Sequence, residues 1–441
     1  MFEEPEKEPF FSGARKTQII VALIAAVAVI YYFSNPKPSA HYDYTFRVAE
    51  NILRGRIGFA EKPPTWLNEF VPFGNKWFSV FPLGGVLTMI PFAFLKLVGI
   101  VKEMPAAFIA SFSSAVICIF LYLISNKYAV SFAKQILLIV SILFGTWMWM
   151  NLTFGGAWQF ALGFAMIGEL GAIYFTVYDR KPLVAGFFFA MAFGNRTENL
   201  LTAPIFMWIL YKFQVSSFKF QVEEIETENK SSSKKRKIKD QNFETKSEIP
   251  NPKSQIIHIA RFCVFPFILG ILTLVYNYIR FDSPTDFGYA RIPGVLQEPW
   301  YFDGIFSVQY IPGQAWEMLL HLWEVKNEFP YLVPNGFSSS IVWSSPFLLL
   351  IFRRKHLNRS LVILTWIAIV ILTFLLWIHG NSGGWQFGYR YAMILLPWFF
   401  VLLLENSPKK ITLTEGVLIA FSILMNLYAT WLFHWTDYVK P

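Results

Sequence analysis

The feature that most limits how this chain can fold is a series of apolar runs that recurs from residue 19 to residue 433. Most of these runs have roughly the 20 residues that an α-helix needs to cross a bilayer. The composition agrees, because 55% of the 441 residues are hydrophobic and only 15% are charged. The sequence therefore predicts an all-α polytopic membrane protein and excludes a water-soluble globular enzyme.

The formal net charge of +9 could suggest a nucleic-acid partner. The basic residues instead lie in short loops between apolar runs, as is typical of loops that stay in the cytoplasm. We therefore interpret the charge as a determinant of topology and expect no nucleic-acid partner. Cys118 and Cys263 both lie inside apolar runs, so neither a disulfide framework nor a thiolate metal site is supported.

Composition also divides the chain into modules. The middle of the chain contains the run SSSKKRKIK among many acidic residues and almost no aromatic ones, a pattern typical of disordered cytoplasmic segments. With about eleven predicted spans, the expected parts are a cytoplasmic N-terminus (1–17), an N-terminal transmembrane catalytic module (18–213) with an external loop (34–81), a basic insertion (214–255) and a C-terminal transmembrane module (256–441) with an external loop (280–337).

Two apolar segments leave two topologies open. Segment 82–100 carries two prolines and can either span the membrane or lie at its interface. Segment 183–211 has the polar residues RTEN in its middle, so it is either one overlong span or two short helices that meet at a turn. If both segments span, Arg180 and Lys181 lie outside. If neither does, these two residues lie in the cytoplasm, which the positive-inside rule favours, and we prefer this topology.

Under the preferred topology, the unusual polar residues share the outer face. Charges at membrane depth are costly and usually line an aqueous or ligand-filled cavity. Arginine forks bind phosphate, aromatic rings stack on sugars, and a carboxylate can accept a proton from a hydroxyl, so such a cavity suits a phosphate-linked sugar. The candidate site residues are Asp43 as the catalytic acid or base, and Arg196, Glu198, Tyr289, Trp385 and Arg390 as substrate-binding residues.

Four of the candidates, Asp43, Arg196, Glu198 and Arg390, also have a purely structural interpretation. Asp43 precedes a helical run that starts at Tyr44, where an aspartate is a favoured N-cap. Arg196 and Glu198 can form an ion pair that satisfies itself. Arg390 can extend to the membrane interface from a glycine-rich turn.

Four segments together resemble the membrane-embedded glycosyltransferases of the GT-C superfamily. The resemblance is nearest to the bacterial relatives of the dolichyl-phosphate-mannose protein mannosyltransferases and of the lipid A aminoarabinose transferase. It covers nearly the whole chain except the insertion, and it implies a GT-C-type helical bundle with long external loops. The segments are HYDYTFRVAENILRG (41–55), FGNRTENLL (193–201), YNYIRFDSPTDFGY (276–289) and GGWQFGYRYAMILLP (383–397).

The resemblance implies roles for individual residues. The essential acid of the first external loop, which acts as a base or places a metal, corresponds to Asp43. The basic residue that binds the carrier phosphate corresponds to Arg196, and Trp385 and Arg390 would frame the cavity. Many members carry an Asp-Glu pair, whereas Asp43 is followed by Tyr44. We therefore expect no certain cofactor, and a divalent metal stays an open alternative.

The resulting expectation is a glycosyltransferase in a bacterial inner membrane, with membrane lipid around it and its site on the periplasmic face. It would move a sugar from a polyprenyl-phosphate donor to a hydroxyl of a lipid, glycan or protein acceptor. Two alternatives stay open, a glycolipid transporter or flippase and a glycan ligase or polymerase.

Overall fold

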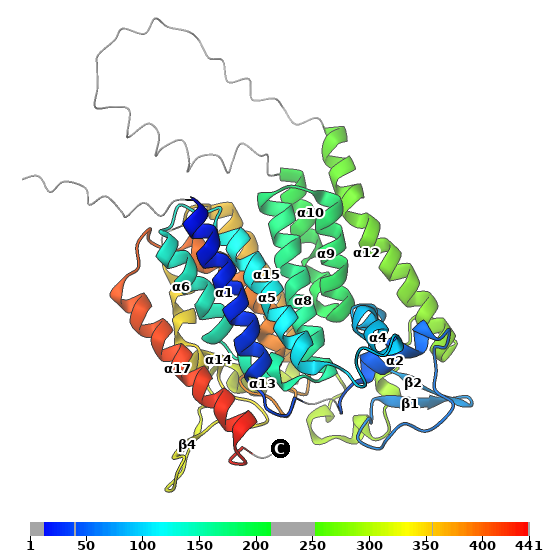
Figure 1. The fold of residues 1–441 in the computed structure, drawn as a ribbon. Helices are drawn as coiled ribbons and strands as arrows, with labels where there is room; N and C mark the ends of the chain where they lie inside the picture. The colour runs from blue at the N-terminus through cyan, green and yellow to red at the C-terminus, as the bar shows by residue number, and fades with distance from the viewer. Residues whose placement is uncertain (1–12, 39–40, 213–251, 355, 440–441) are drawn as a thin grey trace, which may run out of the picture.

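The computed structural model describes residues 13–38, 41–212, 252–354 and 356–439, and it is mainly a helical bundle (Figure 1). Six of the described helices are long and apolar enough to cross a membrane. A seventh span forms if α6 (Phe132–Phe144) and α7 (Met148–Phe154), which meet at 50°, are counted together. The six are α1 (Gly13–Phe33), α5 (Ala106–Ser125), α8 (Ala157–Ile173) with its π-helical end η1 (Tyr174–Tyr178), α12 (Pro252–Phe281), α15 (Arg359–Ile378) and α17 (Leu413–Trp435).

The predicted count of about eleven spans is not confirmed, because four of the predicted spans are short or broken segments in the structure. The first two are α9 (Pro182–Asn195) and α10 (Ala203–Lys212), which are separated by the 3-10 turn η2 (Thr197–Thr202). The other two are α14 (Ile341–Ser344) with η8 (Pro346–Phe352), and η9 (Arg390–Leu395) with α16 (Leu396–Glu405).

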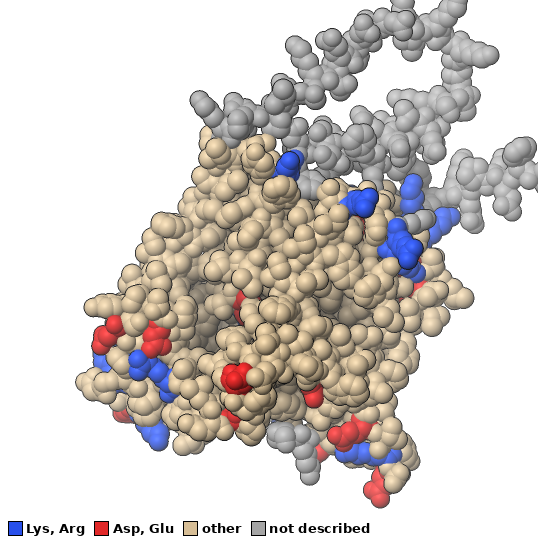
Figure 2. Space-filling model, turned by 180° about the vertical axis from the view of Figure 1, so that it is seen from behind, with Lys and Arg blue, Asp and Glu red and all other residues tan. Residues whose placement is uncertain are grey.

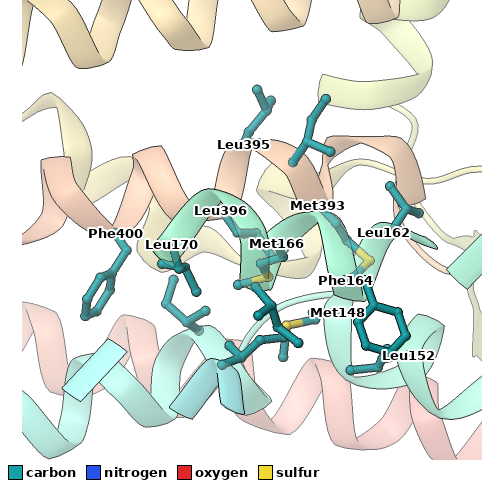
Figure 3. Close-up of a cluster of buried hydrophobic side chains, with 14 of the residues drawn as sticks. Met148, Leu152, Leu162, Phe164, Met166, Leu170, Met393, Leu395, Leu396 and Phe400 are labelled. Carbon is teal, nitrogen blue, oxygen red and sulfur yellow. The ribbon is translucent and has the colours of Figure 1, made fainter. Parts of the chain in front are cut away.

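Hydropathy overcounts here because an apolar segment enclosed by protein needs no full span. Every residue of α16 is buried, and α8 is buried along nearly its whole length. Figure 3 shows how this core is assembled, with Met166 and Leu170 of α8 lying beside Leu396 and Phe400 of α16. An apolar segment has the same hydropathy whether lipid or protein surrounds it, so the sequence does not distinguish the two cases.

One end of the bundle, called here the basic end, gathers loops that carry Lys and Arg. Lys134 of α6 and Arg353 both bond to Glu415 at the start of α17, at 2.8 and 2.5 Å. Lys16 of α1 lies 5.7 Å from the ring of Phe132. On the face seen in Figure 2, the charged side chains of the upper end are mostly basic, whereas the lower part carries both acidic and basic ones.

The chain turns back on itself between α9 and α10. Arg180, just before α9, donates a 3.3 Å hydrogen bond to the carbonyl oxygen of Leu210, near the end of α10. The two helices therefore form a hairpin that starts and finishes at the basic end, with RTEN at its tip. Segment 82–100 forms only the short helices α3 (Leu83–Leu87) and α4 (Ile90–Leu97). Both observations confirm the preferred choice of a turn and a non-spanning segment.

The opposite end, called here the loop end, carries the two long connections. The first contains α2 (Tyr44–Leu53) and the antiparallel hairpin of β1 (Phe70–Phe73) and β2 (Lys76–Ser79), in which Phe70 pairs with Ser79. The second contains η4 (Tyr289–Arg291), η5 (Val295–Gln297), η6 (Pro299–Tyr301), η7 (Val308–Tyr310), α13 (Ile311–Leu319), β3 (Glu324–Val325) and β4 (Leu332–Val333). In Figure 1 the first connection lies beside the lower end of α12.

The predicted domain limits meet the described residues at two places. Most of the predicted insertion 214–255 lies outside them, but α12 begins at Pro252, so its last four residues are helical. Most of the N-terminal segment 1–17 also lies outside them, and α1 begins at Gly13.

Candidate functional site

Arg196 stands at the tip of the α9–α10 hairpin. The helix ends at Asn195, and Arg196 takes an extended backbone conformation before the turn η2 begins. Its guanidinium group bonds to Glu198 and lies 4.7 Å from the ring centre of Tyr391. The ion pair expected from the sequence is therefore present, and the arginine also faces an aromatic residue from a distant part of the chain.

Arg390, the residue directly before Tyr391, contacts the same ring. It opens η9 after a glycine-rich turn, and its Nη1 donates to the carbonyl oxygen of Gly384 at 3.0 Å. Its guanidinium group lies 5.1 Å from the ring centre of Tyr391 and 5.6 Å from that of Trp158. Two arginines thus meet on one tyrosine at the loop end of the bundle.

Glu69 joins these arginines and was not found from the sequence. Its carboxylate accepts a 2.8 Å hydrogen bond from the indole Nε1 of Trp158. Burial raises the pKa of Glu69 to about 7, against the opposing effects of that hydrogen bond and of the positive charges of Arg390 and Arg196. An acid enclosed among large apolar residues, in the stretch LNEFVPF, was the only signal in the sequence. We call Glu69, Trp158, Arg196, Glu198, Arg390 and Tyr391 the arginine site.

Hydrogen-bond donors in the arginine site lack acceptors. Within the described part of the chain, the Nε–H groups of Arg196 and Arg390 are buried and have no hydrogen-bond partner. Buried polar groups are nearly always hydrogen-bonded in proteins, so two such donors on neighbouring cations indicate a place for an anionic acceptor group. The geometry suits an oxyanion such as phosphate.

A row of aromatic side chains extends the arginine site on the side of the second long connection. The hydroxyl of Tyr289 is 2.8 Å from that of Tyr301, which lies 3.4 Å from Nε2 of His379. The ring centre of His379 is 5.9 Å from that of Tyr391. Tyr289, a predicted site residue, is therefore connected to the arginine site through these rings.

Asp43 lies in a separate cavity of about 500 Å³ beside α2 and α4. We call this cavity the charged pocket. Its lining residues are His41, Asp43, Arg47, Glu50, Asn51, Arg54, Arg56, Phe59, Lys96, Lys102 and Glu103. Asp43 is buried, whereas Arg54, Arg56, Lys102 and Glu103 are exposed, so an acid forms the floor, and three cations and one acid form the rim.

The carboxylate of Asp43 does not cap α2, although the residue occupies the N-cap position. It accepts a 2.6 Å bond from Nε of Arg47 instead. Burial raises the pKa of Asp43, against the opposing effect of Arg47. The capping interpretation is therefore wrong for the side chain, and a partly desolvated carboxylate faces the pocket.

Tyr44 follows Asp43 in the chain and packs against the arginine site. Next to Asp43, it donates its hydroxyl to Oδ1 of Asn68 at 3.0 Å, one residue before Glu69. Its ring centre lies 5.2 Å from that of Trp158. Asp43 and the arginine site are therefore linked through the residue that follows Asp43 in the chain.

Two glycines fix α3 against the hairpin tip. A Cβ atom added at Gly84 would lie 2.4 Å from the backbone of Gly194, which is two residues before Arg196. On the same short helix, the hydroxyl of Thr88 is 3.1 Å from Oδ1 of Asn195. This backbone contact holds the first long connection and the end of α9 in one arrangement.

Trp385 lies outside the arginine site. Its ring packs 6.5 Å from Phe154 and 6.1 Å from Phe433, between α7 and α17. Of the six predicted site residues, the structure thus joins Arg196, Glu198 and Arg390, connects Tyr289 to them, and places Asp43 and Trp385 apart.

The side chains of the described residues are not grouped in a way that would hold a metal ion. Asp43, which would place a divalent metal, is paired with Arg47. Over the described ranges, no group of three or more His, Cys, Asp or Glu side chains is arranged to hold a metal ion.

Comparisons with known proteins give structural similarity only. No family model and no curated protein sequence matches the chain. Two crystal structures of the *Archaeoglobus fulgidus* oligosaccharyltransferase are similar to it, the apo form (TM-score 0.44, 11% identity) and a form tethered to an acceptor peptide containing the NVT sequon (TM-score 0.42, 13% identity). Each match covers 97% of this chain but only 56% and 55% of those chains, so the chain spans just over half their length.

Proposed function

We propose that this chain is a membrane glycosyltransferase that moves a sugar from a polyprenyl-phosphate donor to an acceptor hydroxyl at the loop end. The observation that carries the proposal is the meeting of Arg196 and Arg390 on Tyr391, each with a buried Nε–H that lacks an acceptor among the described residues. A phosphate group satisfies such donors and both positive charges at once.

In the proposed reaction, the arginine site holds the donor's phosphate. The oxygen of the acceptor hydroxyl attacks the anomeric carbon, and the bond from that carbon to the phosphate oxygen breaks. Polyprenyl phosphate leaves with the electron pair, its charge held by the arginines, and the configuration at the carbon inverts. Holding a good leaving group in position can supply most of the rate enhancement.

Asp43 is the proposed acceptor of the hydroxyl's proton. Its raised pKa makes it a better base than an exposed aspartate, because general-base catalysis is most effective when the pKa approaches the working pH. Glu69 lies nearer to the arginines and is the competing choice for this role. The bilayer side is assigned by the positive-inside rule, which puts the basic end in the cytoplasm and the site on the periplasmic face of a bacterial inner membrane.

The test follows release of free polyprenyl phosphate from a panel of polyprenyl-phosphate sugars by the detergent-purified protein, with membrane extract supplying acceptors. Asp43→Asn and Glu69→Gln are compared with Glu61→Gln, which removes an exposed carboxylate of the same loop. We expect release by the wild type and by Glu61→Gln, and loss of release with retained donor binding in Asp43→Asn. Donor binding without release by any of the proteins would favour a transporter or flippase.

A further inference from the structure

The charged pocket carries more positive charge than its own acids balance. Its lining has five Lys or Arg side chains, against the three carboxylates of Asp43, Glu50 and Glu103. Its ion pairs use Asp43 with Arg47, and Glu50 with both Arg54 and Lys96, at 2.6 to 2.7 Å. The pocket therefore keeps an excess of two positive charges when all these groups are ionised.

Half of this excess lies in the group of Glu50, Arg54 and Lys96, and the other half lies at the rim, where Arg56 and Lys102 outnumber the exposed Glu103. Among the described residues, neither Arg56 nor Lys102 has a carboxylate within 4.0 Å, so neither is committed to an ion pair. The two come from separate segments, the turn after α2 and the loop after α4, and they face one cavity. Cations brought together in this way repel each other unless an anion lies between them.

The character of the lining also limits what can enter the pocket. Phe59 is the one Phe, Tyr or Trp among the described lining residues, and the remainder are polar or charged. A neutral sugar would be held better by several aromatic faces, as in the arginine site. A hydrophilic oxyanion matches a polar concave surface with a net positive charge and two unpaired cations.

We propose that the charged pocket binds the acceptor, and that this acceptor carries an oxyanion, most simply a phosphate ester, next to the hydroxyl that receives the sugar. The oxyanion binds Arg56 and Lys102 at the rim, and the hydroxyl reaches Asp43 at the floor. This inference rests on the proposed function, since it names the acceptor class for the same site. A reaction at Asp43 then requires an acceptor phosphorylated or otherwise acidified before it arrives.

The direct test measures binding of sn-glycerol 3-phosphate, a small phosphate ester with free hydroxyls, and of glycerol as its neutral counterpart. Isothermal titration calorimetry of the protein in detergent compares the wild type with the double variant Arg56→Gln/Lys102→Gln and with Lys76→Gln, which removes an exposed charge on β2 outside the pocket. Because the arginine site is itself proposed to hold phosphate, each protein is also measured in an Arg196→Gln background.

In that background we expect glycerol phosphate to bind and glycerol not to bind. The double variant should weaken binding at least tenfold, Lys76→Gln should leave it unchanged, and added salt should reduce it. Both rim side chains are exposed, and an unchanged melting temperature would show that the double variant folds. Absence of a preference for glycerol phosphate over glycerol, or equal binding by the double variant, would overturn the proposal.

A second arm separates an acceptor from the membrane's own headgroups. Suppose that phosphatidylglycerol micelles displace glycerol phosphate from the protein, and that the double variant no longer binds these micelles. The rim would then bind membrane lipid headgroups in place of an acceptor, and the proposal would be wrong. These measurements use no sugar donor, so their outcome is independent of the release assay. Glycerol phosphate binding can fail while polyprenyl phosphate release still supports the transferase, and release can fail while glycerol phosphate still binds.

Discussion

The arginine site and the charged pocket both place acids among arginines at the loop end, yet they satisfy their charges in different ways. In the arginine site, the two arginines lie on an aromatic ring and keep buried donors without acceptors among the described residues. In the charged pocket, Asp43 and Glu50 are already ion-paired, and the spare cations are exposed. Enclosed cations suit a group that must be held while a bond breaks, and exposed cations suit a group that must enter and leave.

The largest expected effect is that of Asp43→Asn. If the floor of the charged pocket accepts the proton, the amide cannot replace it, and transfer should fall by about 10² to 10⁴-fold. Donor binding should be unchanged, because the arginine site is intact. The measurement is polyprenyl phosphate release together with donor affinity. Full transfer by this variant would show that Asp43 is not the base.

Arg196→Gln and Arg390→Gln should act on the other site. Each removes a charged donor from the proposed phosphate, and charged hydrogen bonds contribute about 1.5–3 kcal/mol, so donor affinity should fall about 10- to 100-fold. Binding of the lipid-phosphate donor is measured directly. Arg291→Gln, which loses an exposed ion pair with Asp286, is the control and should bind donor normally.

Gly84→Ala tests whether the two sites depend on one backbone contact. The added Cβ would meet the backbone of Gly194 and must push α3 away from α9. We expect a loss of about 1–3 kcal/mol in the free energy of unfolding and a lower transfer rate. Gly270→Ala, on α12 with open space around its Cβ, is the matched control. Equal melting temperatures for the two variants would contradict this role for the contact.

The pH dependence of donor binding should report Glu69. Burial raises its pKa to about 7, so below pH 7 it is mainly neutral and above pH 7 mainly an anion. An anionic donor is repelled by ionised Glu69, and therefore affinity should fall by a few-fold, roughly, as pH rises from 6 to 8. Titrations at the two pH values check this for the wild type, and Glu69→Gln should flatten the change. If donor affinity still changes with pH in Glu69→Gln, another group, such as the phosphate, is responsible for that change.

Tyr289→Phe should give the smallest change. It removes only the 2.8 Å hydrogen bond to Tyr301, worth about 0.5–1.5 kcal/mol, and leaves the ring in place. Donor affinity should weaken tenfold at most. A larger loss would place the Tyr289 hydroxyl on the donor itself.

Sequence reasoning predicted the helical membrane class, the hairpin at RTEN and the gathering of Arg196, Glu198 and Arg390. These features follow from charge and hydropathy, which can be read directly from the sequence. It missed Glu69, because only tertiary packing brings Trp158 and the arginines to that loop. It overcounted the spans for a related reason, since a buried segment such as α16 reads like a lipid-facing one.

The hairpin of α9 and α10 has a consequence for how the proposed lipid-borne donor would gain access. The 14 residues of α9 rise by about 21 Å, whereas the hydrocarbon core is about 30 Å thick. If α9 starts at the cytoplasmic boundary, its tip stops inside the outer leaflet. Arg196 is then within reach of a phosphate whose prenyl tail stays among the surrounding acyl chains, so the carrier can dock sideways from the bilayer and need not be lifted into water.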